Sequence, residues 1–190
     1  MLLLVGLGNP GPSSTNNRHN IGFRIIDAIN LHFKLSKQKP KFKGLLTTGN
    51  IQTKKVYAIK PLTFMNNSGT AIKELIDYFK IESKDVIVFH DDMDIDFGKI
   101  KAKFGGSSAG HNGIESIDKF IGKDYSRVRI GIGHPKQKKK VNNHVLEDFK
   151  DDEEEKIKEI TDNIVNSIPT LIEKKIDLFS STVNQKLNGI

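Results

Sequence analysis

Two hydrophobic patterns alternate along this chain, and their alternation constrains the fold more than any other feature of the sequence. Short apolar runs, which are typical of buried strands, occupy residues 2–5, 86–89 and 128–132. Between these runs, apolar side chains recur at helical spacing over residues 21–29, 71–79 and 114–121. Strands that alternate with helices predict the α/β class, with a twisted, mostly parallel sheet flanked by helices.

A hairpin is predicted in the first half of the chain. Residues 45–50 and 54–60 flank a short polar turn, a pattern that indicates two antiparallel strands. We therefore expect a mixed sheet rather than a purely parallel one.

The carboxyl-terminal part of the chain predicts a long amphipathic helix. Acidic residues 151–155 precede an apolar stripe over residues 157–171, and acidic side chains are favoured at the positive end of a helix dipole. Pro169 lies inside this stripe and should kink or interrupt the helix near residues 167–168. A second short helical segment is then expected over residues 176–187.

Length and composition narrow the class of protein. A chain of 190 residues is expected to fold as one domain spanning residues 1–190. No apolar run approaches the ~20 residues that span a bilayer, so we expect a cytoplasmic protein without membrane contact. We also expect it to act as a monomer. The absence of cysteine excludes disulfides, thiolate metal sites and cysteine nucleophiles.

The chain is basic, with a formal net charge of +7. A basic protein favours a polyanionic partner, because lysine and arginine release condensed counterions from phosphates. The same charge is also compatible with a lysine-rich composition that serves solubility, so charge alone decides nothing.

The glycine motif GLGNPG at residues 6–11 formally matches the dinucleotide-binding fingerprint GxGxxG. That fingerprint needs a helix that begins at the glycines, but a polar loop continues through residues 12–17. Asp27 lies inside the next predicted helix, where it is badly placed to hold a ribose. We interpret the loop instead as a scaffold that places His19 above the carboxyl end of a strand, where open α/β sheets bind ligands.

Histidine and aspartate follow a second predicted strand in the motif HDDMD, residues 90–94. One interpretation is a metal site formed by Asp91, Asp92 and Asp94. The other is that one aspartate accepts a hydrogen bond from His19, fixes its tautomer and stabilises the imidazolium. A single histidine at a helix start is more often structural than catalytic, so the assignment of His19 as a catalytic residue depends on the residues that surround it.

Polar side chains also gather in KPLTFMNNSG, residues 60–69. Asn67 or Ser68 can cap the following helix, whereas Asn66 is free to bind a neutral ester through its amide. Phe64 can stack on a base or ribose, or can be buried in the core.

The segment KIKAKFGGSSAGHNG, residues 99–113, combines a basic strand with a loop of small residues. Alternation along the strand places Lys99, Lys101 and Lys103 on one face, where they can bind a sugar-phosphate backbone. Asn112 either caps the following helix or faces the same cleft. Arg127 and the lysine-rich residues 136–140 are further candidates for phosphate contacts.

Six motifs, taken in order, closely resemble the bacterial peptidyl-tRNA hydrolase family. They cover residues 6–135 and are GLGNPG, RHNIGF, PLTFMNNSG, HDDMD, GGSSAGHNG and RVRIGIGHP. The resemblance implies hydrolysis of the ester between a peptide and the terminal ribose of tRNA, without a metal or cofactor.

The resemblance also implies roles for individual residues. His19 matches the general base that activates water, and Asp91 the carboxylate that supports it. Asn9 matches the position that discriminates blocked from free aminoacyl esters. Asn66 and Asn112 match substrate-binding amides, and Phe64 matches an aromatic residue that contacts tRNA.

Two positions depart from the family pattern. Ser14 replaces the usual tyrosine, so its assignment as a tRNA-binding residue is in doubt. Asn17 replaces a frequent threonine, a change that we expect to have little effect. Two alternative functions remain: an RNA-binding protein without catalysis on the same fold, and a metal-dependent phosphoesterase that uses Asp91, Asp92 and Asp94.

Overall fold

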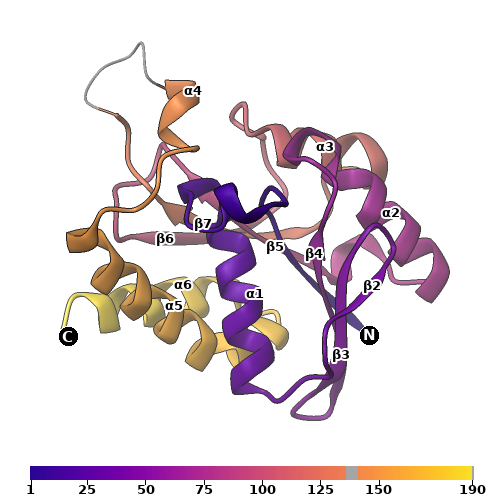
Figure 1. Cartoon of the computed structure of the whole chain (residues 1–190). Helices are drawn as coiled ribbons and strands as arrows, with labels where there is room; N and C mark the ends of the chain where they lie inside the picture. Colours follow the sequence, from indigo (N-terminus) through magenta and orange to yellow (C-terminus); the bar gives the residue numbers. More distant parts are fainter. Residues whose placement is uncertain (136–140, 190) are drawn as a thin grey trace.

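A computed structural model describes residues 1–135 and 141–189 of the chain. This part of the chain forms a seven-stranded mixed sheet with the strand order β2-β3-β4-β1-β5-β7-β6 (Figure 1). The strands are β1 (Leu2–Gly6), β2 (Lys39–Lys41), β3 (Gly44–Ile51), β4 (Lys54–Pro61), β5 (Val86–Asp92), β6 (Ile100–Phe104) and β7 (Ser126–Gly131). The four central strands β4, β1, β5 and β7 are parallel, and the outer strands pair antiparallel.

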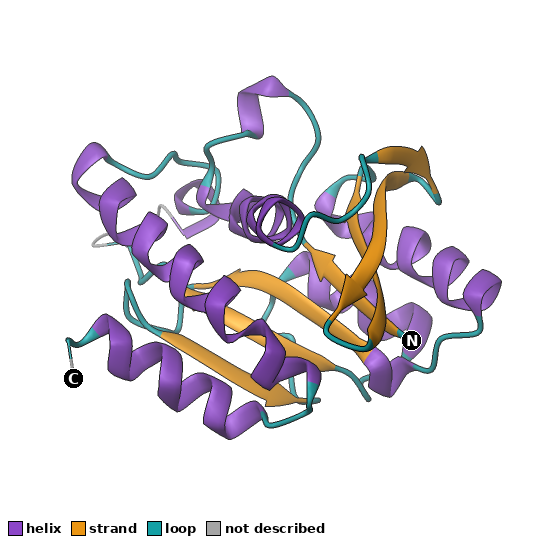
Figure 2. Ribbon diagram, turned by 90° about the horizontal axis from the view of Figure 1, so that it is seen from below, coloured by secondary structure: helices purple, strands orange, loops and turns teal. Residues whose placement is uncertain are grey.

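Helices cover both faces of the sheet, as Figure 2 shows. They are α1 (Ile21–His32), α2 (Ser68–Phe79), α3 (Asn112–Ile121), α4 (Val141–His144), α5 (Asp151–Ile172) and α6 (Ile176–Leu187). Short 3₁₀ helices span Pro12–Ser14, Arg18–Asn20, Met65–Asn67 and Ser83–Asp85. None of the helices in the described ranges is long and apolar enough to cross a membrane.

The alternation of side chains along β1 divides the core into two layers. Leu2 and Leu4 face α1, α5 and α6, whereas Leu3 and Val5 face α2 and α3. Both faces of this central strand are therefore buried, which explains its continuous apolar sequence.

The α/β class and the mixed sheet are confirmed, and so is the predicted hairpin, which β3 and β4 form in antiparallel register. The strand predicted over residues 86–89 is longer than its apolar run, because β5 continues through His90 and Asp91 to Asp92. Asp91 is thus held by a strand rather than by a turn.

The predicted interruption near residues 167–168 was wrong. Helix α5 runs without a break to Ile172, with Pro169 inside its last turn. The proline removes one hydrogen bond, but buried Ile168, Leu171 and Ile172 anchor the turn in the core and outweigh that loss. The second helix over residues 176–187 is confirmed as α6.

A close contact between two glycines brings the start of α1 to the carboxyl end of β1. A Cβ atom on Gly6 would lie 2.2 Å from the backbone oxygen of Gly22, so neither position has room for a side chain. The backbone amide of Leu7 also donates to the oxygen of Phe89 in β5 (3.0 Å). These contacts place the residues just before α1 directly above the end of β5.

Candidate active site

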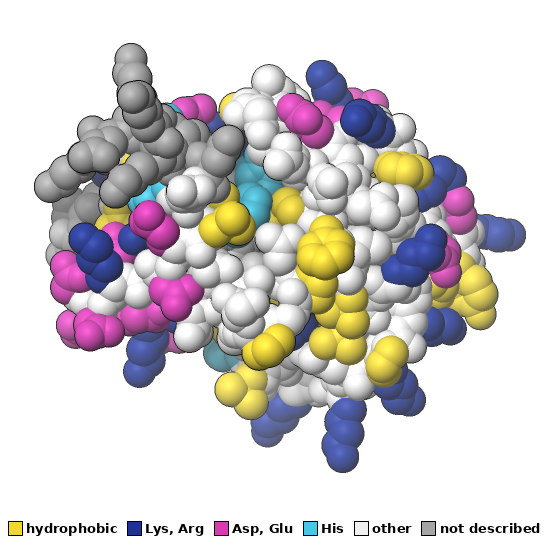
Figure 3. Space-filling view, turned by 45° about the horizontal axis from the view of Figure 1, so that its top comes forward, with side chains coloured by type: hydrophobic (Ala, Val, Ile, Leu, Met, Phe, Trp, Pro, Cys, Tyr) yellow, Lys and Arg dark blue, Asp and Glu magenta, His cyan; other side chains and the backbone are white. Residues whose placement is uncertain are grey.

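A pocket of about 500 Å³ lies at the carboxyl ends of β1 and β5. Figure 3 looks toward this face of the molecule, where histidine side chains are visible near the centre. Six of the predicted site residues line the pocket, namely Asn9, His19, Phe64, Asn66, Asp91 and Asn112. Residues from well-separated parts of the sequence therefore converge on one cavity, as expected for the ends of parallel strands.

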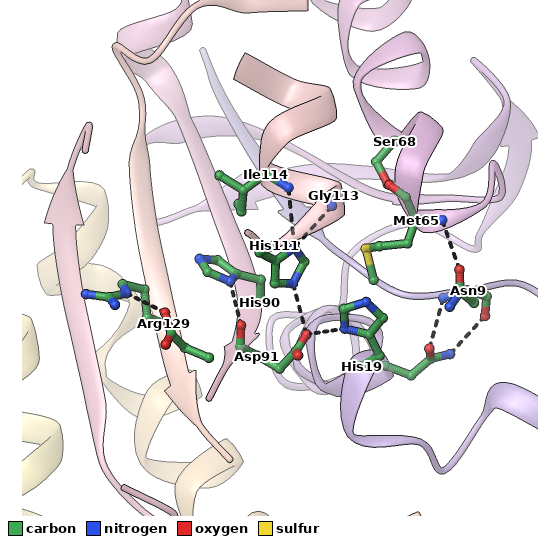
Figure 4. A network of polar contacts seen from close by, with 12 residues as sticks. Asn9, His19, Met65, Ser68, His90, Asp91, His111, Gly113, Ile114 and Arg129 are labelled. Atoms are coloured by element: carbon green, nitrogen blue, oxygen red, sulfur yellow. Dashed lines mark hydrogen bonds and ion pairs between the residues drawn. The ribbon is translucent and has the colours of Figure 1, made fainter. Parts of the chain in front are cut away.

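The pairing of His19 with Asp91 is the central contact of this pocket (Figure 4). The Nδ1 atom of His19 lies 2.7 Å from Oδ1 of Asp91, and both side chains are buried. An ionised carboxylate only accepts hydrogen bonds, so Nδ1 carries the proton and donates it. In the neutral form of this imidazole the Nε2 atom is then the unprotonated one, which is the tautomer that a general base needs.

His111 is a second hydrogen-bond partner of Asp91, and the sequence analysis missed it. Its Nδ1 accepts from the backbone amides of Gly113 (3.1 Å) and Ile114 (3.4 Å), so its proton is on Nε2. Nε2 donates to the same Oδ1 of Asp91 at 3.1 Å. His111 is thus the N-cap of α3, so of the two roles considered for Asn112 the capping role does not hold. Asn112 is the first helical residue and lines the pocket.

The Asp91 carboxylate is held ionised by its surroundings. Burial alone raises the pKa of Asp91, but the positive charge that His19 and His111 carry when protonated, together with their hydrogen bonds, outweighs this effect and holds the pKa below its usual range. The neighbouring His90 donates from Nδ1 to the backbone oxygen of Asp91 (2.7 Å). Burial lowers the pKa of His90 well below its ordinary value, so this imidazole is neutral. One permanent negative charge therefore faces two imidazole N–H groups.

The alternative interpretation, a metal site formed by Asp91, Asp92 and Asp94, does not fit the geometry. Asp92 accepts a hydrogen bond from Nε of Arg129 (2.7 Å), and Asp94 pairs with His134 (2.9 Å), so neither joins Asp91. Among the residues that the structure describes, the one group with three close candidate ligands is His19, Asp91 and His111. A metal ion there would need the Nε2 lone pair of His111, whose proton is fixed by the two capping bonds. This donor set fits a hydrogen-bond network better than a cation.

Asn9 is held in place by contacts on both its backbone and its side chain. Its backbone amide donates to Oδ1 of Asn20, whose Nδ2 donates back to the oxygen of Asn9, both at 2.9 Å. Its side-chain Oδ1 accepts from the backbone amide of Met65 (2.9 Å). No hydrogen bond to another described residue engages the Nδ2 group, and because Asn9 lines the pocket this group can donate to a bound ligand. Met65 and Asn20 are positioning residues that the sequence analysis did not identify, because their roles depend on contacts between distant loops.

Phe64 and Asn66 flank Met65 at the rim of the pocket. Phe64 is 70% exposed, so its alternative assignment to the core was wrong. Asn66 is also exposed. A large exposed aromatic ring beside a polar pocket is suited to stacking on a base or ribose.

The lysines predicted at positions 99, 101 and 103 are not among the residues that line the pocket. Lys101 and Lys103 are on β6 at the sheet edge, whereas Lys99 precedes that strand. Lys103 is half-buried, and burial together with the charges of Arg127 and Arg129 lowers its pKa. This local excess of positive charge is compatible with a phosphate contact.

Three further sequence candidates have different outcomes. Arg127 is buried and donates to the backbone oxygens of Ser107 (2.8 Å) and Gly105, so it fixes the loop before α3 and is not available for phosphates. Ser14 lies in the 3₁₀ helix Pro12–Ser14 and is not among the residues that line the pocket. The lysine-rich residues 136–140 lie outside the described residues.

Comparisons with known proteins point to one family. The sequence model of the family described as "Peptidyl-tRNA hydrolase" matches residues 3–189. A peptidyl-tRNA hydrolase of Pelagibacter ubique is 74% identical over 98% of this chain and 100% of its own length. One from Bartonella quintana is 45% identical, with 97% and 96% covered. A crystal structure of the peptidyl-tRNA hydrolase from Acinetobacter baumannii superposes with a TM-score of 0.91 at 33% identity, over 97% of this chain and 94% of that one.

Proposed function

Because this chain belongs to the peptidyl-tRNA hydrolase family, we propose that the pocket around His19 and Asp91 is its active site. The protein is a hydrolase that acts on the ester bond of peptidyl-tRNA. The observation that carries the site assignment is the hydrogen bond from His19 to Asp91, since it leaves Nε2 of the imidazole free at the pocket.

In the proposed reaction, Nε2 of His19 removes a proton from a water molecule as the water oxygen attacks the ester carbonyl carbon. Asp91 stabilises the resulting imidazolium. The amides of Asn66 or Asn112 donate to the developing oxyanion. The bond between the carbonyl carbon and the ribose oxygen then breaks, and the imidazolium returns its proton to that oxygen. The products are a peptide with a free carboxyl group and a tRNA with a free terminal hydroxyl.

We assign substrate discrimination to Asn9. A peptidyl ester carries an amide carbonyl next to the reacting residue, whereas a free aminoacyl ester carries a charged amine at the same place. The Nδ2 group of Asn9 is a donor that can bind the carbonyl but repels the amine, so blocked esters are preferred.

Binding of the tRNA is proposed to use an aromatic contact near the pocket and a phosphate contact farther away. Phe64 stacks on the acceptor end, and Lys101 and Lys103 bind the phosphate backbone. Ser14 contributes little, because it lacks the aromatic ring of the family tyrosine. We further propose that the enzyme acts as one domain and as a monomer in the cytoplasm, where translation generates its substrate. A non-catalytic RNA-binding role is not favoured, since it does not require the buried pairing of His19 with Asp91.

The direct test compares an N-blocked aminoacyl-tRNA with the free aminoacyl-tRNA, in chelator-containing buffer. We expect rapid release of tRNA from the blocked substrate and little release from the free one. Asn9→Ala should reduce the rate on the blocked substrate, and it should therefore lower the ratio of the rates on the blocked and the free aminoacyl-tRNA. Equal cleavage of both substrates by the wild-type protein would contradict the role of Asn9, and complete loss of activity in chelator would contradict the metal-free mechanism.

A further inference from the structure

We infer that Asn17 is a positioning residue for His19, because its side chain fastens one wall of the pocket to the residues that carry the base. This inference rests on the proposed role of His19. The wall is the segment 145–148, which is distant in sequence from Asn17 but lies beside it in the fold. In Figure 1 the orange chain after α4 passes next to the indigo loop that precedes α1.

The side chain of Asn17 is almost fully buried and makes two contacts with this segment. Its exposed fraction is 7%. Its Nδ2 donates to the backbone oxygen of Leu146 and to Oδ1 of Asp148, the second at 2.9 Å. The two segments also form an antiparallel bridge between Asn17 and Asp148. Both amide protons of Asn17 are therefore used to hold segment 145–148.

The same segment binds the backbone of the proposed base. The amide of Arg18 donates to the oxygen of Glu147 (3.0 Å), and the amide of His19 donates to the oxygen of Val145 (2.8 Å). Val145 and Leu146 also line the pocket with His19. The His19 backbone is thus fixed by segment 145–148, while its ring is fixed by Asp91. A shift of the segment would move Nε2 relative to the ester.

An asparagine is better suited to this task than the threonine that the family often has. A hydroxyl group has one proton to donate, whereas the amide of Asn17 donates two. We therefore no longer expect that the replacement of the family threonine by Asn17 has little effect. The loop before α1 and the chain just after the segment are also joined by contacts that do not involve Asn17. Buried Arg18 pairs with Glu153 (2.6 Å) and packs over the ring of Phe149 (4.8 Å). Loss of the Asn17 contacts should accordingly shift the segment without unfolding the protein.

The test uses Asn17→Ala, Asn17→Thr and the matched control Asn16→Ala, which replaces the exposed neighbouring asparagine. A small displacement of a catalytic group costs up to about a hundredfold in rate, so we expect Asn17→Ala to lower kcat about tenfold and to change KM less than about threefold. Asn17→Thr should recover part of the loss, because it keeps one donor. The proton on Nδ1 of His19, followed by NMR, should exchange faster with solvent in Asn17→Ala than in Asn16→Ala.

A double variant separates this inference from the proposed function. In a His19→Ala background, Asn17→Ala should cause no further loss of rate, because Asn17 acts through His19. The inference is overturned if Asn17→Ala turns over like Asn16→Ala while His19→Ala is inactive, or if the loss persists unchanged in the His19→Ala background. An active His19→Ala enzyme would instead contradict the proposed function itself.

Discussion

Replacement of Asp91 by asparagine isolates the electrostatic part of the proposed mechanism. Asp91→Asn keeps the size and shape of the side chain, and the amide oxygen can still accept from Nδ1 of His19 and Nε2 of His111. What disappears is the negative charge next to the imidazolium that forms when His19 takes a proton. The change therefore separates orientation of the ring from stabilisation of its charge.

The distances in the structure set the size of the effect. Asp91 is 1% exposed and its Oδ1 lies 2.7 Å from Nδ1 of His19. Two unit charges whose centres are ~4 Å apart interact by ~4 kcal/mol at an effective dielectric constant near 20, which corresponds to a rate loss of about a thousandfold. We therefore expect kcat to fall by about 100- to 1000-fold, whereas KM changes less than about threefold because Asp91 has no proposed contact with tRNA.

Single-turnover hydrolysis of N-blocked aminoacyl-tRNA is the appropriate assay, since it separates the chemical step from product release. Binding of tRNA to Asp91→Asn is measured in parallel, and the thermal unfolding of the variant shows that it is folded. An unchanged single-turnover rate would refute the electrostatic argument. A rise in KM at constant kcat would also refute it, because Asp91 would then act in binding.

Three other predictions test the surroundings of the site. Phe64→Ala should raise KM by about tenfold or more, because stacking on a base contributes ~1–3 kcal/mol. Phe64→Tyr should behave like wild type, and a KM of Phe64→Ala equal to that of wild type would contradict the stacking contact. Lys103→Ala should reduce the slope of log binding constant against log salt by about 0.7–0.9, and an unchanged slope would argue against a phosphate contact. The pKa of Asp91 is depressed in the folded protein, so its stabilising contribution is fully present above its ordinary value of 3.8 and is lost as pH falls. Unfolding temperature below pH ~4 should therefore fall less steeply for Asp91→Asn than for wild type, and parallel curves would contradict the assignment.

Much of the fold could be predicted because its signals are local. Apolar runs and helical periodicity identified β1, β5 and the helices α1, α2 and α3. Since parallel strands end at one edge of the sheet, the same reasoning predicted that an aspartate of the HDDMD motif pairs with His19, and the family resemblance identified this aspartate as Asp91. Their hydrogen bond follows from this topology.

The failures share one physical cause, which is that tertiary contacts outweigh local preferences. Pro169 remains inside α5 because the last turn is buried, and Arg127 is engaged by the carbonyls of its own loop rather than exposed to phosphates. His111 was overlooked because a histidine N-cap is less usual than an asparagine, and its bond to Asp91 spans 20 residues. The contacts of Asn17 with segment 145–148 span about 130 residues, a distance at which no pattern of one sequence gives a signal.

The central claim is that Nε2 of His19 takes the proton from the attacking water. The most direct measurement is the single-turnover rate of His19→Asn on N-blocked aminoacyl-tRNA, compared with wild type at the same fraction of folded protein. An amide cannot accept that proton at neutral pH, and general base catalysis contributes roughly 100- to 10000-fold, so the rate should fall by that range while tRNA binding is retained. A His19→Asn enzyme that cleaves the ester within about threefold of the wild-type rate would contradict the account.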